Sequence, residues 1–274
     1  MRPTLAEKRE AFRALHADGC FVLPNPWDAG SAVLLESLGF KALASTSAGM
    51  AWAMGRPDYG VARDEVLEHL SILTHASALP VNADFENGFS DDPEGVAANV
   101  ALAADTGVAG LSVEDATGDP ANPLYDFDLA VARIAAARKA LDGTGVVLTA
   151  RSEGFIRGRP DLDETIRRLT AFAEAGADCL YAPGLPGEAE ITAVVRAVAP
   201  LPVNVLSPGL PKATLAAWGV RRISVGGSLA RAAWGGFLTA AREMAEHGTF
   251  DALSRGAPGG ELNRIFAEAQ DRLA

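Results

Sequence analysis

"LPVNADFENGFSDDPEGVAANVALAADTG" (residues 79–107) joins a short apolar run to a helical pattern through a polar turn. The Asn87-Gly88 pair alone would suit a β-hairpin, because such dipeptides favour tight two-residue turns between strands. The residues after this pair, however, carry the pattern of a helix. Asp92 is a helix-capping residue, Pro93 suits the first helical position, and Gly107 ends the apolar spacing of three and four. The stretch therefore predicts one strand–loop–helix unit, with Asn87-Gly88 as the turn of a βα loop.

The same unit recurs along the chain. Helical patterns separate most of eight short apolar runs, and alternating strands and helices imply parallel pairing. Eight units fit a closed (β/α)8 barrel of the TIM type better than an open doubly wound sheet. No G-x-G-x-x-G follows the first run, so the dinucleotide-binding alternative loses its main signal. The predicted strands are "CFVLPN" (20–25), "KALASTS" (41–47), "LPVNADFE" (79–86), "GLSVED" (110–115), "VVLTARS" (146–152), "CLYAPG" (179–184), "LPVNVLS" (201–207) and "RRISVGG" (221–227).

The C-terminal part extends beyond the eight units. A long helical pattern, "SLARAAWGGFLTAAREMAEHG" (228–248), precedes the break "RGAPGG" (255–260) and a last helical pattern. We expect residues 1–250 to form the barrel and residues 251–274 a helical extension. This extension could pack on its own barrel or on a neighbouring subunit.

Composition narrows the class of protein. The chain has 274 residues, 49% of them hydrophobic, and a net charge of −11. An acidic surface argues against nucleic acid and anionic membranes as partners. The N-terminal pattern lacks the apolar core of a signal peptide, and no run of about 18 apolar residues predicts a membrane span. Two distant cysteines predict neither a disulfide framework nor a zinc site. We expect a cytoplasmic protein.

Acidic residues dominate the predicted active-site end of the barrel, which is formed by the carboxyl ends of the strands. Asp84 and Glu86 are two residues apart, so they are expected on one side of their strand, and Glu114 ends the next strand. Three converging carboxylates would repel one another, and Mg²⁺ or Mn²⁺ would relieve that repulsion. The alternative is that these acids face solvent or cap helices, as we expect of Asp115.

Other strand ends offer groups that bind anions. Arg151 could clamp a substrate carboxylate or form an ion pair with a nearby acid. The "ASTSAG" stretch offers three hydroxyls and backbone N–H groups, but could be an ordinary βα loop. "SVGGS" (224–228) lies where many barrels bind phosphate, although small residues there also serve close packing. Histidines and lysines end no predicted strand, so a Schiff-base aldolase is not expected. The three hydroxyls belong to Ser45, Thr46 and Ser47, and weaker candidates for substrate binding are Tyr181 and Asn204.

These motifs, in this order, resemble the isocitrate lyase/phosphoenolpyruvate mutase superfamily. The resemblance runs from "LPNPWDAGSA" (23–32) to "SVGGSLARAA" (224–233). It rests on the serine of "ASTSAGMAWAMGRPD" and the aspartate thirteen positions later, on the D-x-D/E pair, and on "VED" and "TAR". The corresponding residues are Ser45, Asp58, Asp84, Glu86, Glu114 and Arg151.

The resemblance implies a (β/α)8 barrel whose last helices exchange between subunits in a homodimer or homotetramer. It implies Mg²⁺ held by Asp84, Glu86 and Glu114, largely through water, and a small 2-oxo or 2-hydroxy carboxylate as substrate. The serine turn and Arg151 would hold the substrate's carboxylate, and Asp58 would lie close to the substrate or to metal-bound water. A mobile loop after "VED" would close over the site and bring Asn122 to the reacting group.

Two departures from the superfamily pattern lie in the loops. Isocitrate and methylisocitrate lyases carry K-[KR]-C-G-H in the mobile loop, where this chain reads "EDATGDPANP" (114–123). The mutases and phosphonopyruvate hydrolases carry a lysine and an asparagine there. Asn122 matches the asparagine, and Pro120 stands near the position of the lysine.

The sequence therefore predicts a Mg²⁺-dependent, lyase-type enzyme that makes or breaks a C–C or P–C bond through an enolate. One alternative is a hydrolase or decarboxylase of an oxaloacetate-like or phosphonopyruvate-like substrate. A second is a phosphate-binding barrel isomerase that uses "SVGGS". A third is a protein that binds oxo acids without turnover, because the mobile loop departs from every subgroup.

Overall fold

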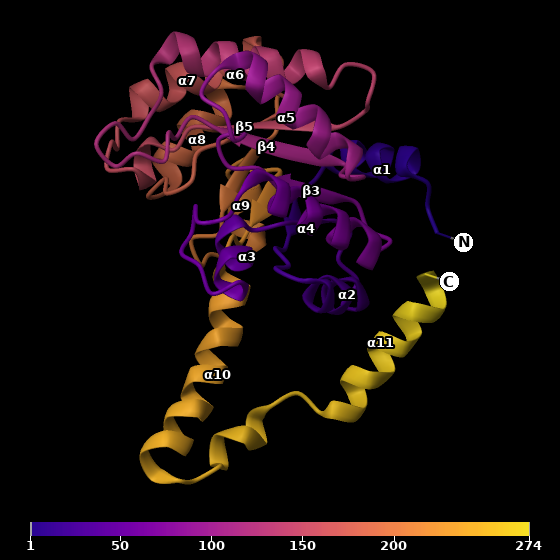
Figure 1. Ribbon diagram of the computed structural model, residues 1–274. Helices are drawn as coiled ribbons and strands as arrows, with labels where there is room; N and C mark the ends of the chain where they lie inside the picture. The colour runs from indigo at the N-terminus through magenta and orange to yellow at the C-terminus, as the bar shows by residue number, and fades with distance from the viewer. Residues whose placement is uncertain (1, 274) are drawn as a thin grey trace.

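The computed structural model describes residues 2–273, and its centre is a parallel barrel of eight strands (Figure 1). The strand order β1-β8-β7-β6-β5-β4-β3-β2 follows the chain around the ring. A hydrogen bond from the Ala44 amide to the Pro24 carbonyl, 3.0 Å long, links the two end strands, so the barrel is nearly closed. The (β/α)8 prediction is confirmed. The strands are β1 Phe21–Leu23, β2 Leu43–Ala44, β3 Val81–Asp84, β4 Gly110–Glu114, β5 Val147–Arg151, β6 Cys179–Tyr181, β7 Val203–Leu206 and β8 Arg222–Ser224.

Helices surround the barrel, and the predicted caps begin and end them. Asp92 caps α5 by accepting a hydrogen bond of 2.8 Å from the Gly95 amide, and Pro93 is its first residue. The Asn87-Gly88 turn closes through a 2.9 Å bond from the Gly88 amide to the Phe85 carbonyl, as expected of a βα loop. The helices are α1 Leu5–Ala17, α2 Ala29–Ser37, α3 Ser47–Ala53, α4 Arg63–Ala76, α5 Pro93–Asp105, α6 Phe127–Ala140, α7 Leu162–Glu174, α8 Glu188–Ala197, α9 Lys212–Ala217, α10 Ser228–His247 and α11 Gly259–Leu273, with 3₁₀ turns at Gly154–Ile156 and Asp251–Arg255.

The barrel interior is unusually polar. Apolar side chains fill the layer between strands and helices, and Phe12 of α1 packs against the first residues of several strands. Inside the barrel, where branched apolar residues are usual, lie buried polar side chains. They include Asn82, Ser112, Thr149, Asn204 and Arg222. Burying polar groups is costly unless they form hydrogen bonds, and Arg222 donates one of 2.8 Å to Asn204.

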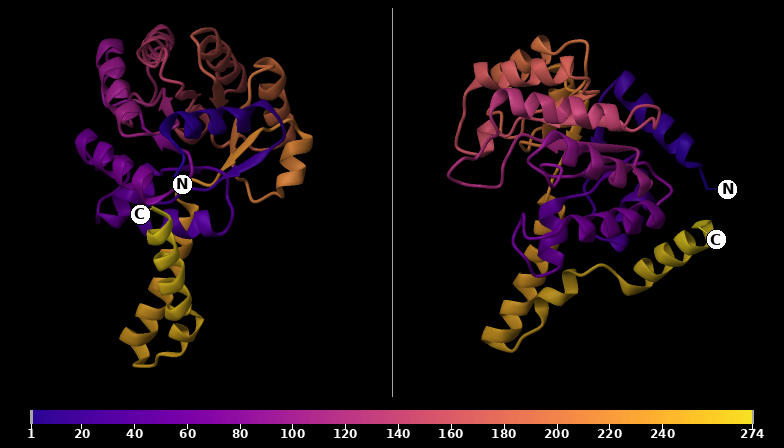
Figure 2. Two further views of the ribbon diagram at one scale, coloured as in Figure 1. Left: turned by 90° about the vertical axis from the view of Figure 1, so that its right-hand side faces the viewer. Right: turned by 45° about the horizontal axis from the view of Figure 1, so that its top comes forward.

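The C-terminal helices leave the barrel and return to it. Helix α10 projects away from the barrel, and α11 runs back toward the N-terminal part, as Figure 2 shows from two sides. Helix α11 packs on α2 of the same chain, and Ala269 is buried there. The middle of α10 exposes apolar side chains, among them Trp234 and Phe237. Between residues 2 and 273, no helix combines the length and the apolarity that crossing a membrane requires.

Candidate active site

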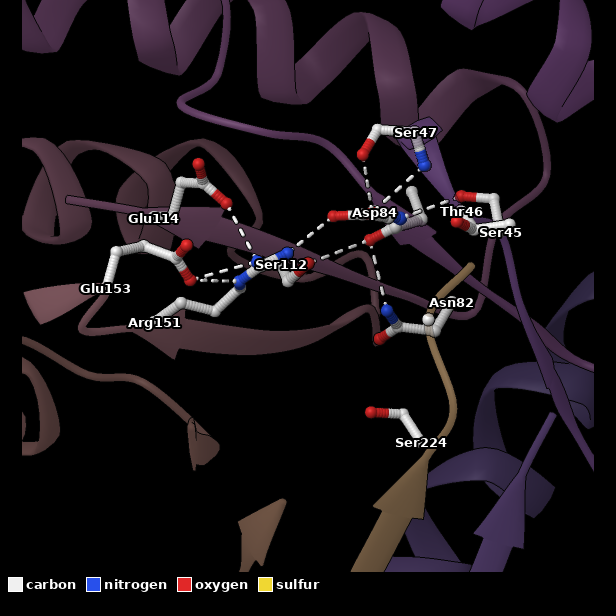
Figure 3. Close-up of polar contacts among 12 residues, drawn as sticks. Ser45, Thr46, Ser47, Asn82, Asp84, Ser112, Glu114, Arg151, Glu153 and Ser224 are labelled. Carbon is white, nitrogen blue, oxygen red and sulfur yellow. Dashed lines mark hydrogen bonds and ion pairs between the residues drawn. The ribbon is translucent and has the colours of Figure 1, made fainter. Parts of the chain in front are cut away.

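A cavity of about 190 Å³ opens among the carboxyl ends of the strands and continues into the barrel. Asp58, Asp84, Arg151 and Tyr181 line its mouth, and more deeply buried polar groups line its interior. Figure 3 shows Asp84, Glu114, Arg151 and the serine turn converging on this end of the barrel. The space would hold about six water molecules, which suits a small organic acid.

Arg151 is the centre of the site. Its guanidinium lies between three carboxylates: it is 2.6 Å from Asp84 Oδ1, 3.0 Å from Glu114 Oε2 and 2.9 Å from Glu153 Oε1. The guanidinium also lies over the ring of Tyr181, with 5.1 Å between Cζ and the ring centroid. Burial alone would lower the pKa of Arg151, but the surrounding carboxylates raise it, so the group stays cationic.

A second cation and a tyrosine cover the acids from the side. Tyr59 donates a hydrogen bond from its hydroxyl to Glu114 and accepts one from Arg157. The Arg157 guanidinium lies 4.7 Å from the centroid of the Tyr59 ring and 3.7 Å from Glu153 Oε2. Tyr59 has a left-handed backbone, with φ of 61°, which is uncommon for a bulky residue and is found preferentially at functional sites.

Carboxyl groups outnumber cations in the site. Among residues 2–273, the five acids Asp58, Asp84, Glu86, Glu114 and Glu153 share two ion-pairing or neighbouring cations, Arg151 and Arg157, so the carboxyl groups exceed these cations by three. Burial, followed by the charge of neighbouring acids, raises the pKa of Glu86 to about 8. Burial likewise raises the pKa of Glu153 to about 7 and raises that of Asp58 and of Glu114. Such a cluster favours protons or a bound cation.

This imbalance predicts a pH dependence of stability for the metal-free protein. The Glu86 carboxyl ionises near its ordinary pKa of 4.5 when unfolded and near 8 when folded. Between these values the folded state holds more protons, so the free energy of unfolding falls as the pH rises. Glu86→Gln should flatten this fall, measured as melting temperature in EDTA from pH 5 to 9. Glu68→Gln, an exposed control, should not, and an unchanged slope in Glu86→Gln would contradict the shift.

The serine turn holds Asp84. Ser45 Oγ accepts a 2.8 Å hydrogen bond from the Asp84 amide, and the amide and hydroxyl of Ser47 each donate to Asp84 Oδ2 at 3.0 Å. Thr46 caps α3 by accepting a hydrogen bond from the Gly49 amide. The turn therefore fixes the orientation of the Asp84 carboxylate, a role that the sequence did not suggest.

The other predicted substrate-binding residues are distributed unevenly. Tyr181 and Asn204 line the cavity, and Asn204 donates to Ser224 Oγ at 3.0 Å. Asn122 is exposed in the loop between β4 and α6, where its amide lies 3.3 Å from Asp119 Oδ2. The lining of the cavity does not include Asn122, so a role at the reacting group requires the loop to move.

Two expectations about acidic residues were wrong. Strand β3 ends at Asp84, and Glu86 has φ of 45°, so strand alternation does not orient the two side chains as a pair. Asp115 neither faces solvent nor caps a helix. It is buried, lies 3.1 Å from Arg168 Nη1 and accepts a 2.8 Å hydrogen bond from the Glu153 amide. It therefore anchors the loop that carries Glu153.

Four residues of the site had been given no role by sequence reasoning. Glu153 follows Arg151 by two residues, and that spacing could have drawn attention to it. Tyr59 and Arg157 reach the site from loops, and no sequence spacing relates them to the strand ends. Asn25 lies at the end of the first predicted strand, and its Oδ1 accepts hydrogen bonds of 2.9 Å from the amides of Val225 and Gly226.

The turn after β8 uses its backbone amides and its space for contacts within the protein. Two backbone amides of this turn already donate hydrogen bonds to Asn25 Oδ1. A Cβ on Gly227 would lie 2.9 Å from the Trp52 ring. Close packing therefore accounts for the small residues of "SVGGS". This arrangement weakens the phosphate-binding alternative.

The donor set suits a divalent cation that keeps its water. Within residues 2–273, no three acidic, histidine or cysteine side chains converge closely enough to hold a metal by themselves, because Arg151 lies between the carboxylates. Mg²⁺ needs no such cage, since it commonly keeps several waters and takes one or two carboxylates. The donors are oxygen atoms, the carboxyl groups exceed the neighbouring cations, and Glu153 Oε2 is buried without a hydrogen-bond partner among the described residues. The residues therefore fit a hydrated Mg²⁺.

Comparison with known proteins agrees with the fold and the motifs. The family model of phosphoenolpyruvate phosphomutase matches residues 12–245. A solved structure of a lyase/mutase candidate from Burkholderia cenocepacia J2315 is 52% identical, covers 96% of each chain and superposes with a TM-score of 0.93. An uncharacterized protein of Mycobacterium tuberculosis is 32% identical over 96% of this chain and 99% of its own. Oxaloacetate decarboxylase of Bradyrhizobium diazoefficiens is 31% identical over 92% of this chain and 86% of its own. The chain belongs to the phosphoenolpyruvate phosphomutase family, within the isocitrate lyase/phosphoenolpyruvate mutase superfamily.

Proposed function

We propose that the protein is a Mg²⁺-dependent, lyase-type enzyme that cleaves or forms a bond next to the oxo group of a small 2-oxo or 2-hydroxy carboxylate. The observation that carries the proposal is the barrel-mouth cavity, where Arg151 faces an excess of buried carboxyl groups. A hydrated cation would balance the excess of carboxyl groups, and a substrate carboxylate would pair with Arg151. The homologous enzymes act on substrates of this kind, as the name oxaloacetate decarboxylase states.

Asp84, with Glu86 and Glu114 through water, would hold the metal, which supplies positive charge beside a developing enolate oxygen. Arg151 is already cationic and fixed by three partners, so its charge can attract a substrate carboxylate while Asp84 keeps its orientation. The serine turn, formed by Ser45, Thr46 and Ser47, keeps Asp84 in place. The same turn would bind the substrate's carboxylate. Asp58, whose pKa burial raises, is suited to exchange a proton at the cavity mouth.

Decarboxylation of an oxaloacetate-like acid is a second candidate, and the composition of the β4–α6 loop favours it. Residues 115–126 contain no cysteine, histidine or lysine that could protonate a leaving group. Loss of carbon dioxide needs no such acid, because the carboxylate leaves as a neutral molecule and its bonding electrons form the enolate. A proton then adds to the enolate carbon. This route uses only the carboxylate clamp and the charge at the barrel mouth.

The test is product analysis of the purified protein with oxaloacetate, phosphonopyruvate and 2-methylisocitrate, with Mg²⁺ and with EDTA. Pyruvate and carbon dioxide from oxaloacetate would identify a decarboxylase, and oxalate with acetate a hydrolase. Binding of oxo acids without turnover would overturn the enzymatic proposal. Stabilisation by phosphosugars, but not by oxo acids, would overturn the substrate class.

We also propose that α10 exchanges between subunits in a homodimer or homotetramer, while α11 keeps its contact with α2 of its own chain. Helix α10 exposes 37% of Trp234, 60% of Phe237 and 43% of Leu238, which is unfavourable in water. Phe237→Asp should convert the oligomer to a monomer in light scattering, because it buries a charge in the contact. Leu102→Asp, a control at an exposed leucine of α5, should not, and a monomeric wild-type protein would contradict the proposal. A cytoplasmic location accords with such an enzyme.

A further inference from the structure

Arg222 is a buried arginine without an acidic partner. Only 2% of the residue is exposed, and its guanidinium forms no ion pair with any carboxylate of residues 2–273. Its Nε donates to Asn204 Oδ1 at 2.8 Å, and its Nη1 lies 3.3 Å from His16 Nε2. By contrast, Arg151, which lines the same cavity, has three acidic partners.

His16 does not neutralise this charge. Burial and the nearby Arg222 lower the pKa of His16 to about 3, so the imidazole is neutral. Its Nδ1 lies 2.8 Å from the Phe12 carbonyl, which requires a proton on Nδ1 and leaves Nε2 to accept from Arg222. The partners of Arg222 are therefore neutral, and its charge is uncompensated nearby.

Arg222 lies at the floor of the same cavity whose mouth carries Arg151. Both residues line it. One register row joins Arg222, Asn204, Tyr181 and Arg151 across β8 to β5, and Arg222 is the first residue of its strand while Arg151 is the last of its own. Because strands of such a barrel tilt, this row climbs from the floor to the mouth. The cavity thus has one cation at each level.

The groups around the floor are neutral and polar. Asn82, Ser112, Asn204 and Ser224 line the cavity beside Arg222 and carry amide or hydroxyl groups. In Figure 3, Asn82 and Ser224 point into the same interior space. Asn82 Oδ1 has no hydrogen-bond partner among the described residues. A buried, uncompensated cation surrounded by hydrogen-bonding groups is costly unless an anion shares its site.

We propose that Arg222 forms an anion subsite at the barrel floor, which takes a second carboxylate of the substrate. The inference rests on the proposed function and narrows its substrate class from small oxo or hydroxy acids to dicarboxylates. One carboxylate, with its oxo or hydroxy group, lies at the mouth near Arg151 and Asp84. The other reaches inward to Arg222 and Asn204. The small volume of the cavity restricts the ligand to a short acid.

Lactate and malate provide the probes, because malate is lactate with one added carboxylate. Titration calorimetry with Mg²⁺ should give a wild-type affinity for one malate enantiomer about 10- to 100-fold above that for lactate, the range for a charge-assisted hydrogen bond. Arg222→Gln should bring this ratio close to one. Arg133→Gln, which replaces a buried arginine outside the cavity, should retain the ratio.

Asn204→Asp is a second variant that tests the same subsite in case Arg222→Gln does not fold. It is nearly isosteric and would place a carboxylate against Arg222 Nε, where Asn204 Oδ1 already lies at 2.8 Å. This internal anion should abolish the malate preference while the protein stays folded. Equal wild-type affinities, or a preference that persists in both variants, would overturn the subsite but leave the proposed function standing. If neither acid binds with Mg²⁺, the subsite and the proposed function fall together.

Discussion

Arg151→Met should destabilise the protein by about 3–5 kcal/mol and abolish binding of oxo acids. The substitution leaves Asp84, Glu114 and Glu153 without the cation that lies within 3.0 Å of each. Removing one partner of a buried ion pair has a cost of about this size, because the other charge stays buried. Urea denaturation at pH 8, followed by circular dichroism, measures the loss of stability, and calorimetry with pyruvate and Mg²⁺ measures binding.

The pH dependence separates this mechanism from simple loss of packing. Burial already raises the pKa of Glu114 and of Glu153, and without Arg151 these two acids should take up protons more readily, so the variant should regain stability as the pH falls from 8 to 5. Arg168→Met is a matched control, because Arg168 also pairs with a buried acid, Asp115, at 3.1 Å. It should lose stability and still bind pyruvate. A stable Arg151→Met protein that binds pyruvate normally would refute the central role of Arg151.

Asp84→Asn should remove Mg²⁺-dependent stabilisation and lower turnover by about 100-fold, the upper end of the range for groups that support a metal site. Asparagine keeps the shape and can still contact Ser47, but it lacks the charge that attracts a cation. The measurement is the shift in melting temperature between EDTA and 5 mM Mg²⁺ (roughly the low-millimolar range that saturates weak oxygen sites), together with the rate on the best substrate found.

The control for Asp84→Asn is Asp92→Asn, at an exposed helix cap that lies outside the cavity. It should leave the Mg²⁺ shift unchanged. Asp84→Asn also removes one ion-pair partner of Arg151. The melting temperature of this variant in EDTA should therefore not exceed that of the wild type. An Mg²⁺ shift equal to that of the wild type would show that Asp84 does not hold the metal.

Local patterns were sufficient to predict the barrel. The patterns that predicted it are local, since each can be recognised within a few residues of sequence. They are the eight apolar runs, the helix cap Asp92 with Pro93, and the glycines that end helices. The same alternation predicted that strand ends would carry the site. It correctly brought Asp84, Glu114 and Arg151 together, although they are separated by 30 residues or more, because carboxyl ends of parallel strands meet at one face of the barrel.

Only the tertiary structure decided how these groups pair. Arg151 bonds to three acids at once, Tyr59 reaches Glu114 from a loop 55 residues away, and Asp115 turns inward to Arg168. Such contacts depend on loop paths and on backbone angles, as at Tyr59 and Glu86, that composition and periodicity do not encode. The sequence by itself thus determined the fold and the end of the barrel at which we propose the active site. The tertiary structure decided the charge balance, and with it the uncompensated Arg222 at the barrel floor, because burial and distance set the energy of each charge.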